Sequence, residues 1–199
     1  IEMFRSFLYE IARAKLEYHG YWRAYPRAYN HYFPPLYHKI VNGRLGEYEV
    51  YQGLSFKFDI TSHSRFLLTV DPILRLLMRD DISTLISKVG FEKARKIIKG
   101  KTCVASYERT LGTITRRTLI INDITSFKAG KDKIVPHPQI QGKLVTIKEY
   151  FKLINSPVVD LIRDDDPVVY TTNGNYYPSC LLKLVIDTES IREEAIDVK

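Results

Sequence analysis

The sequence has few of the residues and motifs that would directly identify an enzyme, an extracellular scaffold or a membrane protein. Its two cysteines, Cys103 and Cys180, are too few for a disulfide framework or a four-thiolate zinc site. It lacks the run of about 18 apolar residues that a membrane helix needs, and charges interrupt its first segment, so we expect no membrane span and no signal peptide. We therefore predict a cytoplasmic protein with two reduced thiols. Because the chain begins at Ile1 rather than Met, we also expect a fragment of a longer protein.

The common catalytic motifs are absent as well. The sequence contains no P-loop, no GxSxG, no HExxH and no CxxC pair. Its five histidines lie far apart, and three of them fall in an aromatic N-terminal segment, which favours packing or surface roles over metal binding. We therefore predict no metal, no cofactor and no catalytic residue in this chain.

One acidic cluster leaves an alternative open. Asp164, Asp165 and Asp166 could bind a divalent cation, as the carboxylates of metal-dependent nucleases and phosphoesterases do. Three successive side chains point in different directions, however, and Pro167 follows at once. This pattern is more typical of a solvated turn that leads into a strand.

Positive charge is what the sequence has in excess. It carries 30 Lys and Arg against 23 Asp and Glu, for a formal net charge of +7. Such an excess favours a polyanionic partner, most often nucleic acid, although a solvated lysine-rich surface gives the same balance. The basic run at 92–101 could contact phosphates or form the wet face of a helix whose buried side is Ile97 and Ile98. Arg116 and Arg117 lie beside a glycine turn, where contact with a phosphate is geometrically easy.

Hydrophobic periodicity predicts the elements of the N-terminal part. A helix is expected over 2–18, and an irregular segment over 20–43, whose prolines and aromatics favour packing on a larger body. The aromatic stretch at 18–37 could instead be a docking surface of a protein-interaction module. Strands are expected over 46–60 and 64–72, with one buried face formed by Phe56, Phe58, Phe66 and Leu68.

The period changes at Pro72, and the C-terminal part is expected to be a separate domain. Two or three short helices should fill 72–100, with Asp80 or Asp81 as an N-cap. Strands should follow over 101–110 and 115–125, then a polar loop over 126–142, a short helix with a Thr146–Glu149 capping box, and strands on both sides of an Asn173-Gly174 hairpin. Short strands with one helix-bearing insertion predict an α+β fold containing a small OB-like β-barrel, a class that often binds single strands.

Aromatic pairs are concentrated near the C-terminus. Tyr150 and Phe151 precede the acidic turn, and Tyr176 and Tyr177 follow the hairpin. A cleft of Tyr and Phe with Lys and Arg nearby suits unstacked bases, each stack being worth about 1–3 kcal/mol. Adjacent residues usually point to opposite sides, so about half of these rings are expected in the core.

Several of these stretches resemble a known family. The patterns TIKEYF, DPVV and NYYPSCLLKL resemble, in this order, the C-terminal half of the PAZ domain of Argonaute and Piwi proteins; they occupy 146–151, 166–169 and 175–184. KGKTCVASY at 99–107 and RTLIINDIT at 117–125 are similar to that domain's first and central strands. YQGLSF at 51–56 and FLLTVDP at 66–72 resemble the strands that precede PAZ in Argonaute.

The resemblance implies an architecture and a role. Residues 1–79 would be the end of an N-terminal domain and the first linker, 80–188 a PAZ domain, and 189–199 the start of the following linker. PAZ is an OB-like barrel with a hairpin-helix insertion, and the cleft between them holds the 3′ end of a guide strand. Together with the residues singled out above, the resemblance assigns nucleic-acid binding to Tyr107, Arg116, Arg117, Tyr150, Phe151, Tyr176, Tyr177 and Leu181.

The sequence also departs from the family pattern. Leu119 and Asn155 stand where tyrosines are expected, which implies a weaker grip on phosphate. Such departures are typical of a microbial, archaeal or other prokaryotic Argonaute in silencing or host defence, with a guide of either DNA or RNA. The slicing carboxylates belong to a PIWI domain outside this sequence, so we expect a MID-PIWI partner, fused or separate, and no membrane partner.

Overall fold

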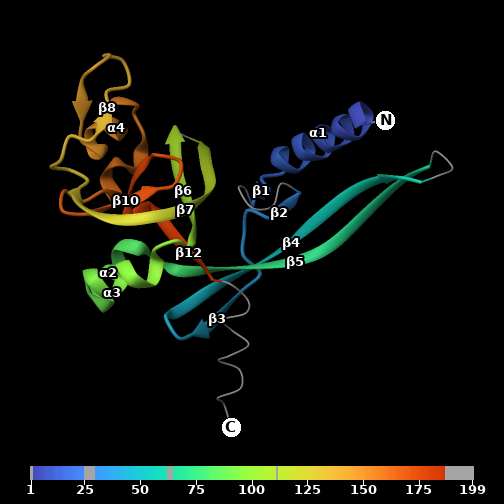
Figure 1. The fold of residues 1–199 in the computed structure, drawn as a ribbon, viewed down its shortest axis with the longest axis horizontal. Helices are drawn as coiled ribbons and strands as arrows, with labels where there is room; N and C mark the ends of the chain where they lie inside the picture. Colours follow the sequence, from blue (N-terminus) through green and yellow to red (C-terminus); the bar gives the residue numbers. More distant parts are fainter. Residues whose placement is uncertain (1, 25–29, 62–64, 111, 187–199) are drawn as a thin grey trace, which may run out of the picture. The chain divides into compact units, whose positions relative to one another are not determined.

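The computed structural model describes residues 2–24, 30–61, 65–110 and 112–186 (Figure 1). Contacts between the described residues divide the chain into two compact units, one that extends to Leu77 and one of Met78–Ile186. Both units combine helices with mostly antiparallel strands, which confirms the mixed α+β prediction. No helix in the described ranges has both the length and the apolar character needed to cross a bilayer.

The first unit is built on a long two-stranded ribbon, with α1 beside it (Figure 1). The predicted helix is α1 (Glu2–Tyr18), and the first predicted strand is β4 (Gly46–Ile60). The sheet order is β1-β2-β4-β5, with β3 also paired to β4. The remaining strands of this unit are β1 (Trp22–Arg23), β2 (His31–Phe33), β3 (Lys39–Gly43) and β5 (Phe66–Asp81), the last of which continues into the second unit.

Aromatic rings form the core of the first unit. The Trp22 and Phe33 rings lie 5.0 Å apart, and Phe56 stacks on Tyr32 and on Tyr9 of α1, each at 5.5 Å. The Tyr9 hydroxyl also accepts a hydrogen bond of 3.1 Å from the backbone N–H of Phe58, which ties α1 to β4. Trp22, Tyr32 and Phe33 of the aromatic N-terminal segment are therefore packed inward. The expectation that this segment is irregular is wrong in part, because β1, β2 and β3 lie within it and pair in the sheet.

The prediction of one buried face along both ribbon strands is wrong in its second half. Phe56 is 4% exposed, whereas Phe66 is 56% exposed and Leu68 is exposed as well. The ring of Phe66 contacts Phe4 of α1 at 4.8 Å, but burial in β5 begins only at Leu76. Alternation of apolar and polar residues predicts a strand, but it does not show whether other elements of the protein cover either face of that strand.

The expected helix at Pro72 is also wrong. Strand β5 continues through Pro72 to Asp81, and the first helix of this part of the chain, α2 (Ile82–Val89), begins only after that strand ends. A short apolar run such as ILRLLM is compatible with either a helix or a strand, and here it forms a strand because it pairs in the sheet. Asp81 is the N-cap, as predicted, because its Oδ1 accepts the N–H of Thr84 at 2.7 Å.

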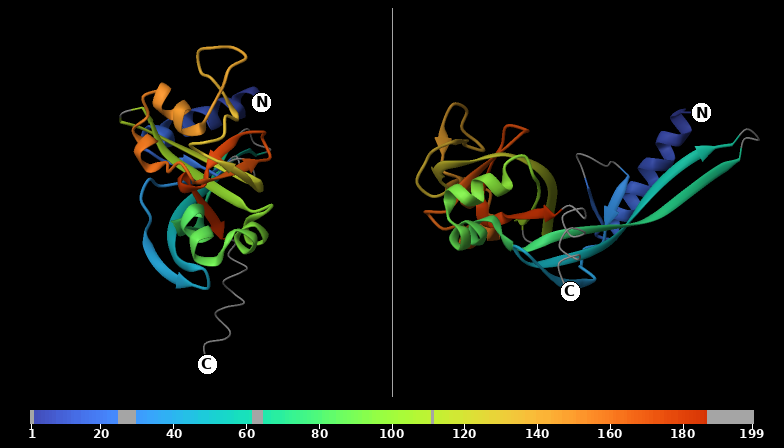
Figure 2. Two further views of the ribbon diagram at one scale, coloured as in Figure 1. Left: turned by 90° about the vertical axis from the view of Figure 1, so that its left-hand side faces the viewer. Right: turned by 60° about the horizontal axis from the view of Figure 1, so that its bottom comes forward.

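The second unit places helices at opposite ends of a strand assembly (Figures 1 and 2). Helices α2 and α3 (Phe91–Ile98) lie at one end, and α4 (Ile147–Leu153) lies at the other with β8 (Val135–Pro136) and β9 (Leu144–Val145). The strand order is β12-β6-β7-β10-β11, and β8 pairs only with β9. The bounds are β6 (Thr102–Thr110), β7 (Thr113–Lys128), β10 (Pro167–Thr171), β11 (Tyr176–Pro178) and β12 (Leu182–Ile186).

This strand order is an open path in the described residues, so the OB-like barrel stays a prediction. The strand expected after the Asn173-Gly174 hairpin is divided into β11 and β12 by the 3-10 turn η2 (Ser179–Leu181). The break lets the chain change partners, since β11 pairs with β10 and β12 pairs with β6. The hairpin at Asn173-Gly174 is confirmed, with Gly174 at φ +83, where a side chain would be strained.

The corrected burial of the ribbon predicts unequal effects of two matched substitutions. Phe56→Ala should destabilise the protein by about 3–5 kcal/mol because it empties a site in the aromatic core. Phe66→Ala should cost about 1 kcal/mol or less, because that ring is half exposed and contacts one neighbouring ring. Chemical denaturation of both variants measures the difference, and equal losses would contradict the burial described above.

A second stability prediction concerns the ion pair that joins α3 to β7. Arg95 donates from Nε and Nη2 to the two carboxylate oxygens of Asp123, each at 2.7 Å. This hydrogen-bonded guanidinium lowers the pKa of Asp123 to about 2. Since the pKa in the unfolded chain is about 4, the stabilisation is complete above that pH and is lost as the pH falls towards 2.

Asp123→Asn should therefore lower stability by about 1 kcal/mol near neutral pH and flatten the loss of stability between about pH 4 and about pH 2. Thermal melting across this range measures both effects. Asp160→Asn is the control, because Asp160 is exposed and no ion pair involves it in the described part of the chain. Parallel acid profiles for wild type and Asp123→Asn would show that the pair does not contribute.

Candidate nucleic-acid interface

The predicted binding residues all lie in the second unit, on several different elements. Tyr107 is on β6 and Arg116 and Arg117 are on β7; Tyr150 and Phe151 are on α4, Tyr176 and Tyr177 are on β11, and Leu181 ends η2. Phe151, Tyr177 and Leu181 are buried, Arg117 is exposed, and the others are intermediate. Each aromatic pair thus has one buried and one partly exposed member.

Local sequence explains why α4 presents Tyr150 and Phe151 together. Thr146 caps the helix: its Oγ1 accepts the N–H of Glu149 at 3.0 Å, and Glu149 Oε2 accepts the N–H of Thr146 at 2.9 Å. The capping box predicted from the sequence is therefore confirmed. It fixes the start of the helix, so Ile147, Tyr150 and Phe151 share the face that packs on the core.

The aromatic rings meet around Phe151. This ring is 6% exposed and packs in a core cluster with Leu181. The Tyr107 ring lies 5.5 Å from it at 84°, and the Tyr150 ring lies 5.8 Å from it at 89°. Both are edge-to-face arrangements, which are favourable for aromatic pairs. Phe151 is therefore the buried ring against which two partly exposed tyrosines pack.

The charge environment of Tyr107 identifies its other neighbours. Burial raises the pKa of this phenol most, the phenols of Tyr177 and Tyr150 raise it further, and the guanidinium groups of Arg117 and Arg109 lower it. Because the net shift is upward, the Tyr107 hydroxyl is neutral at physiological pH and can donate to an anionic oxygen. We call the residues Tyr107, Tyr150, Phe151 and Tyr177 the aromatic cluster.

Strand register places Arg117 with this cluster and Arg116 away from it. In the β6–β7 ladder, Tyr107 lies opposite Thr115 and Ala105 lies opposite Arg117. Opposed residues share a face of the sheet, so Tyr107 and Arg117 are diagonal neighbours on one face. Arg116 pairs with Ser106 and points to the other face. The structure therefore groups Arg117 with the cluster and separates Arg116 from it.

Arg109 is the residue that the sequence analysis missed. It follows Tyr107 by two positions on β6, where the pairing with β7 shifts register between Glu108 and Thr110, so strand alternation does not determine the face on which it lies. It interacts electrostatically with the Tyr107 phenol, as Arg117 does. Strand alternation could not have identified it, because the register of β6 shifts at this position.

The two departures from the family pattern have different surroundings. Leu119 is buried on β7, where it pairs with Cys103, so it adds apolar surface and no hydroxyl to this face. Asn155 is exposed just beyond α4 at φ +53, a left-handed conformation that Asn tolerates better than most residues. The short amide at this position fits the turn that ends the helix.

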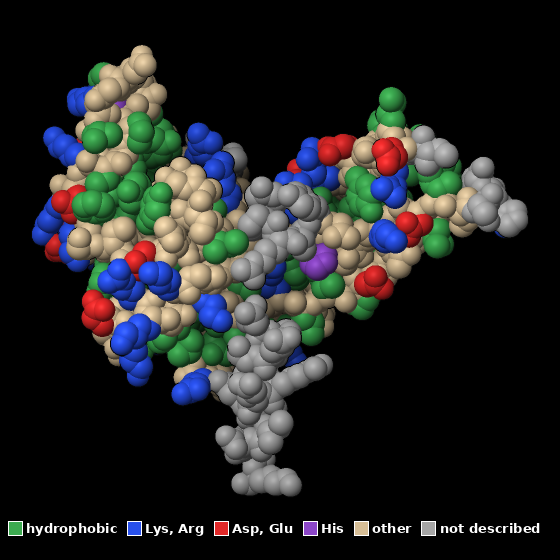
Figure 3. Space-filling model, viewed as in Figure 1, with side chains coloured by type: hydrophobic (Ala, Val, Ile, Leu, Met, Phe, Trp, Pro, Cys, Tyr) green, Lys and Arg blue, Asp and Glu red, His purple; other side chains and the backbone are tan. Residues whose placement is uncertain are grey.

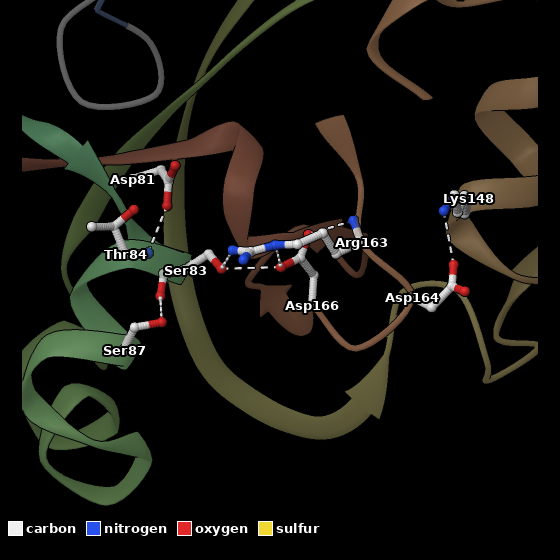
Figure 4. Close-up of polar contacts among 8 residues, drawn as sticks. All are labelled: Asp81, Ser83, Thr84, Ser87, Lys148, Arg163, Asp164 and Asp166. Atoms are coloured by element: carbon white, nitrogen blue, oxygen red, sulfur yellow. Dashed lines mark hydrogen bonds and ion pairs between the residues drawn. The ribbon is translucent and has the colours of Figure 1, made fainter. Parts of the chain in front are cut away.

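The acidic turn does not gather its carboxylates (Figure 4). Asp164 pairs with Lys148 at 2.8 Å and Asp165 pairs with Lys131 at 2.5 Å. Asp166 is buried, and its carboxylate accepts from Ser83 Oγ at 3.0 Å and from the backbone N–H of Arg163 at 2.8 Å. Within the described ranges no group of three acidic, His or Cys side chains could hold a metal. The three carboxylates of the turn therefore bind side chains of other elements and do not converge on one point, as the carboxylates of a metal site would.

Comparisons with known proteins give distant structural similarity only. No family model and no curated protein matches the chain. The structure of A. aeolicus Argonaute is 17% identical with a TM-score of 0.45, and that of Aa-Ago with externally bound siRNA is 17% identical with a TM-score of 0.47; each match covers 99% of this chain and 23% of that chain. Clostridium butyricum Argonaute, bound to a guide DNA and a 19-mer target DNA, is 12% identical with a TM-score of 0.42, over 88% of this chain and 24% of that chain. These values do not assign the chain to a family.

The packing of α4 predicts which member of the Tyr150–Phe151 pair supports the fold. Phe151→Ala should cost about 3–5 kcal/mol, because it removes a buried ring from the core cluster. Tyr150→Ala should cost clearly less, because Tyr150 lies at the edge of that cluster and is partly exposed. Urea denaturation of the two variants tests this order, and a Phe151→Ala protein as stable as wild type would disprove it.

Proposed function

We propose that the second unit binds the 3′ end of a single-stranded nucleic acid, as the PAZ-like part of an Argonaute-type protein. The observation that carries this proposal is the packing of Tyr107 and Tyr150 against the buried ring of Phe151, with Tyr177, Arg117 and Arg109 interacting electrostatically with the Tyr107 phenol. The ordered sequence patterns shared with PAZ domains support it. On this proposal the first unit is the end of an N-terminal domain with the first linker.

The chemistry of the aromatic cluster suits a terminal nucleotide. A half-exposed tyrosine ring offers a stacking surface for a base and a hydroxyl that can donate to a phosphate oxygen. Exposed Arg117 supplies a fixed positive charge beside these hydroxyls, and a guanidinium fork matches the geometry of a phosphate. Such groups bind and position a strand without cleaving it, so the chain would anchor a guide, DNA or RNA, for a MID-PIWI portion that acts in silencing or defence.

The decisive test compares strands with and without an accessible 3′ end. The wild-type protein should prefer a linear single strand with a free 3′ end over a circular strand or one with a bulky 3′ block. Tyr150→Ala should weaken end binding by about 5- to 150-fold, the equivalent of one lost base stack. Arg117→Ala should weaken binding to all sequences about equally, because phosphate contacts carry no base information. Fluorescence anisotropy with labelled oligonucleotides measures all three.

Matched controls separate the site from general effects of Tyr or Arg. Tyr18→Ala and Arg5→Ala remove exposed side chains of α1, outside the second unit, and should leave binding unchanged. Each variant must also melt like wild type. Equal binding of circular and linear strands, or wild-type affinity of a folded Tyr150→Ala protein, would refute end binding by the aromatic cluster.

A further inference from the structure

A cavity of about 530 Å³ lies on the side of α4 that faces away from the aromatic cluster. Its lining includes Glu149, Lys152 and Leu153 of α4, whereas Ile147, Tyr150 and Phe151 pack on the core. At about 100° per residue these two sets fall on opposite faces of the helix. The other wall comes from the segment that carries β8 and β9. This cavity, here called the lysine pocket, therefore lies on a different face of α4 from the aromatic cluster, and Asn155, one of the two departures from the family pattern, also lines it.

The lysines of the pocket lack the carboxylate partners that neighbouring lysines have. Lys133, Lys143 and Lys152 line the cavity, are exposed, and form no ion pair with any described residue. Three other lysines of the same unit are paired: Lys131 with Asp165, Lys148 with Asp164, and Lys88 with Asp80 at 2.6 Å. The three lysines of this cavity thus lack direct ion pairs, whereas Lys131 and Lys148 beside it have them.

His137 adds a hydrogen-bond donor to the same cavity. Its Nδ1 accepts the backbone N–H groups of Gln139 and Ile140, each at 3.1 Å. Since Nδ1 is an acceptor, the neutral ring carries its proton on Nε2, which is left to donate. The only carboxylate in the lining is that of Glu149, and its Oε2 is already engaged by the backbone N–H of Thr146. The polar lining is therefore dominated by donors and cations.

Apolar side chains complete the lining. Leu144 and Leu153 line the cavity, and both side chains are exposed, Leu144 to 51% and Leu153 to 40%. On the face shown in Figure 3, hydrophobic side chains lie between Lys and Arg side chains at the end of the second unit that carries β8 and α4. A cavity lined by both apolar side chains and cations can receive a sugar or base while the cations contact phosphates.

We propose that the lysine pocket is a second contact site for single-stranded nucleic acid, one that binds backbone phosphates away from the 3′ end. The geometry favours a strand over a small free anion. Lys133, Lys143 and Lys152 are exposed point charges spread around an open cavity, and no arginine fork or buried donor in its described lining encloses a single phosphate. Flexible ammonium groups along a surface suit a succession of phosphates. The proposal does not depend on end binding by the aromatic cluster.

The test removes charge from the pocket and follows the salt dependence of binding. Lys133→Gln, Lys143→Gln and Lys152→Gln, combined in the whole chain, keep most of each side chain and delete its charge. Binding of oligo-dT, linear or circular, should weaken, and the log–log slope against salt should become shallower by about 0.7 for each phosphate that the variant no longer neutralises. Lys152→Gln alone gives the same test at a single position.

The matched control removes the same charge from paired lysines. Lys88→Gln, Lys131→Gln and Lys148→Gln should change the slope much less, because Asp80, Asp165 and Asp164 already hold these ammonium groups. If both triple variants shift the slope equally, the effect is general charge and the proposal is wrong. The proposal is also wrong if the pocket variant binds single strands with wild-type affinity. In that case, saturable binding of inorganic pyrophosphate to the wild-type protein would identify a small phosphorylated ligand as the occupant of the pocket.

The outcome is separable from that of the end-binding proposal. The pocket variant should keep any preference for a free 3′ end, whereas Tyr150→Ala should lose that preference and keep the wild-type salt slope of binding to circular strands. If the wild-type protein has no preference for a free 3′ end but the pocket variant has a shallower salt slope, only the aromatic-cluster proposal is refuted. A normal end preference without a slope change in the pocket variant would refute only the lysine-pocket proposal.

Discussion

Burial of one face of α4 is the contact on which both proposed binding surfaces depend. Ile147 and Phe151 pack into the core cluster with Leu181, and the capping box of Thr146 and Glu149 fixes where the helix begins. With that face buried, Tyr150 is held at the cluster edge, and the opposite face is left to line the lysine pocket. A rotation of the helix by one residue would disrupt both surfaces together.

Ion pairs then determine where the excess positive charge is available. The acidic turn neutralises Lys131 and Lys148, and Asp123 engages Arg95, so these cations contribute to the fold. Arg117 and the lysines of the pocket remain exposed. The net charge of +7 is therefore not spread evenly over the second unit, since acidic side chains compensate some regions and leave others attractive to phosphates.

Most elements could be predicted from local sequence signals, and the errors share one cause. Caps at Asp81 and Thr146 and the turn at Gly174 depend on a few adjacent residues, and all three are confirmed. The strand through Pro72 and the exposure of Phe66 depend on pairing and on which faces are covered. For the site, the patterns led to Tyr107, Arg117 and the aromatic pairs, but Arg109 was missed.

The sequence by itself determined the excess of positive charge, the α+β character and the aromatic pairs, because these follow from composition, periodicity and adjacent residues. Only the tertiary structure decided which member of each pair is buried, which of Arg116 and Arg117 shares a face with Tyr107, and which lysines have carboxylate partners. These properties arise from contacts between residues far apart in the chain, where strand register and helix rotation bring groups together that no local pattern relates.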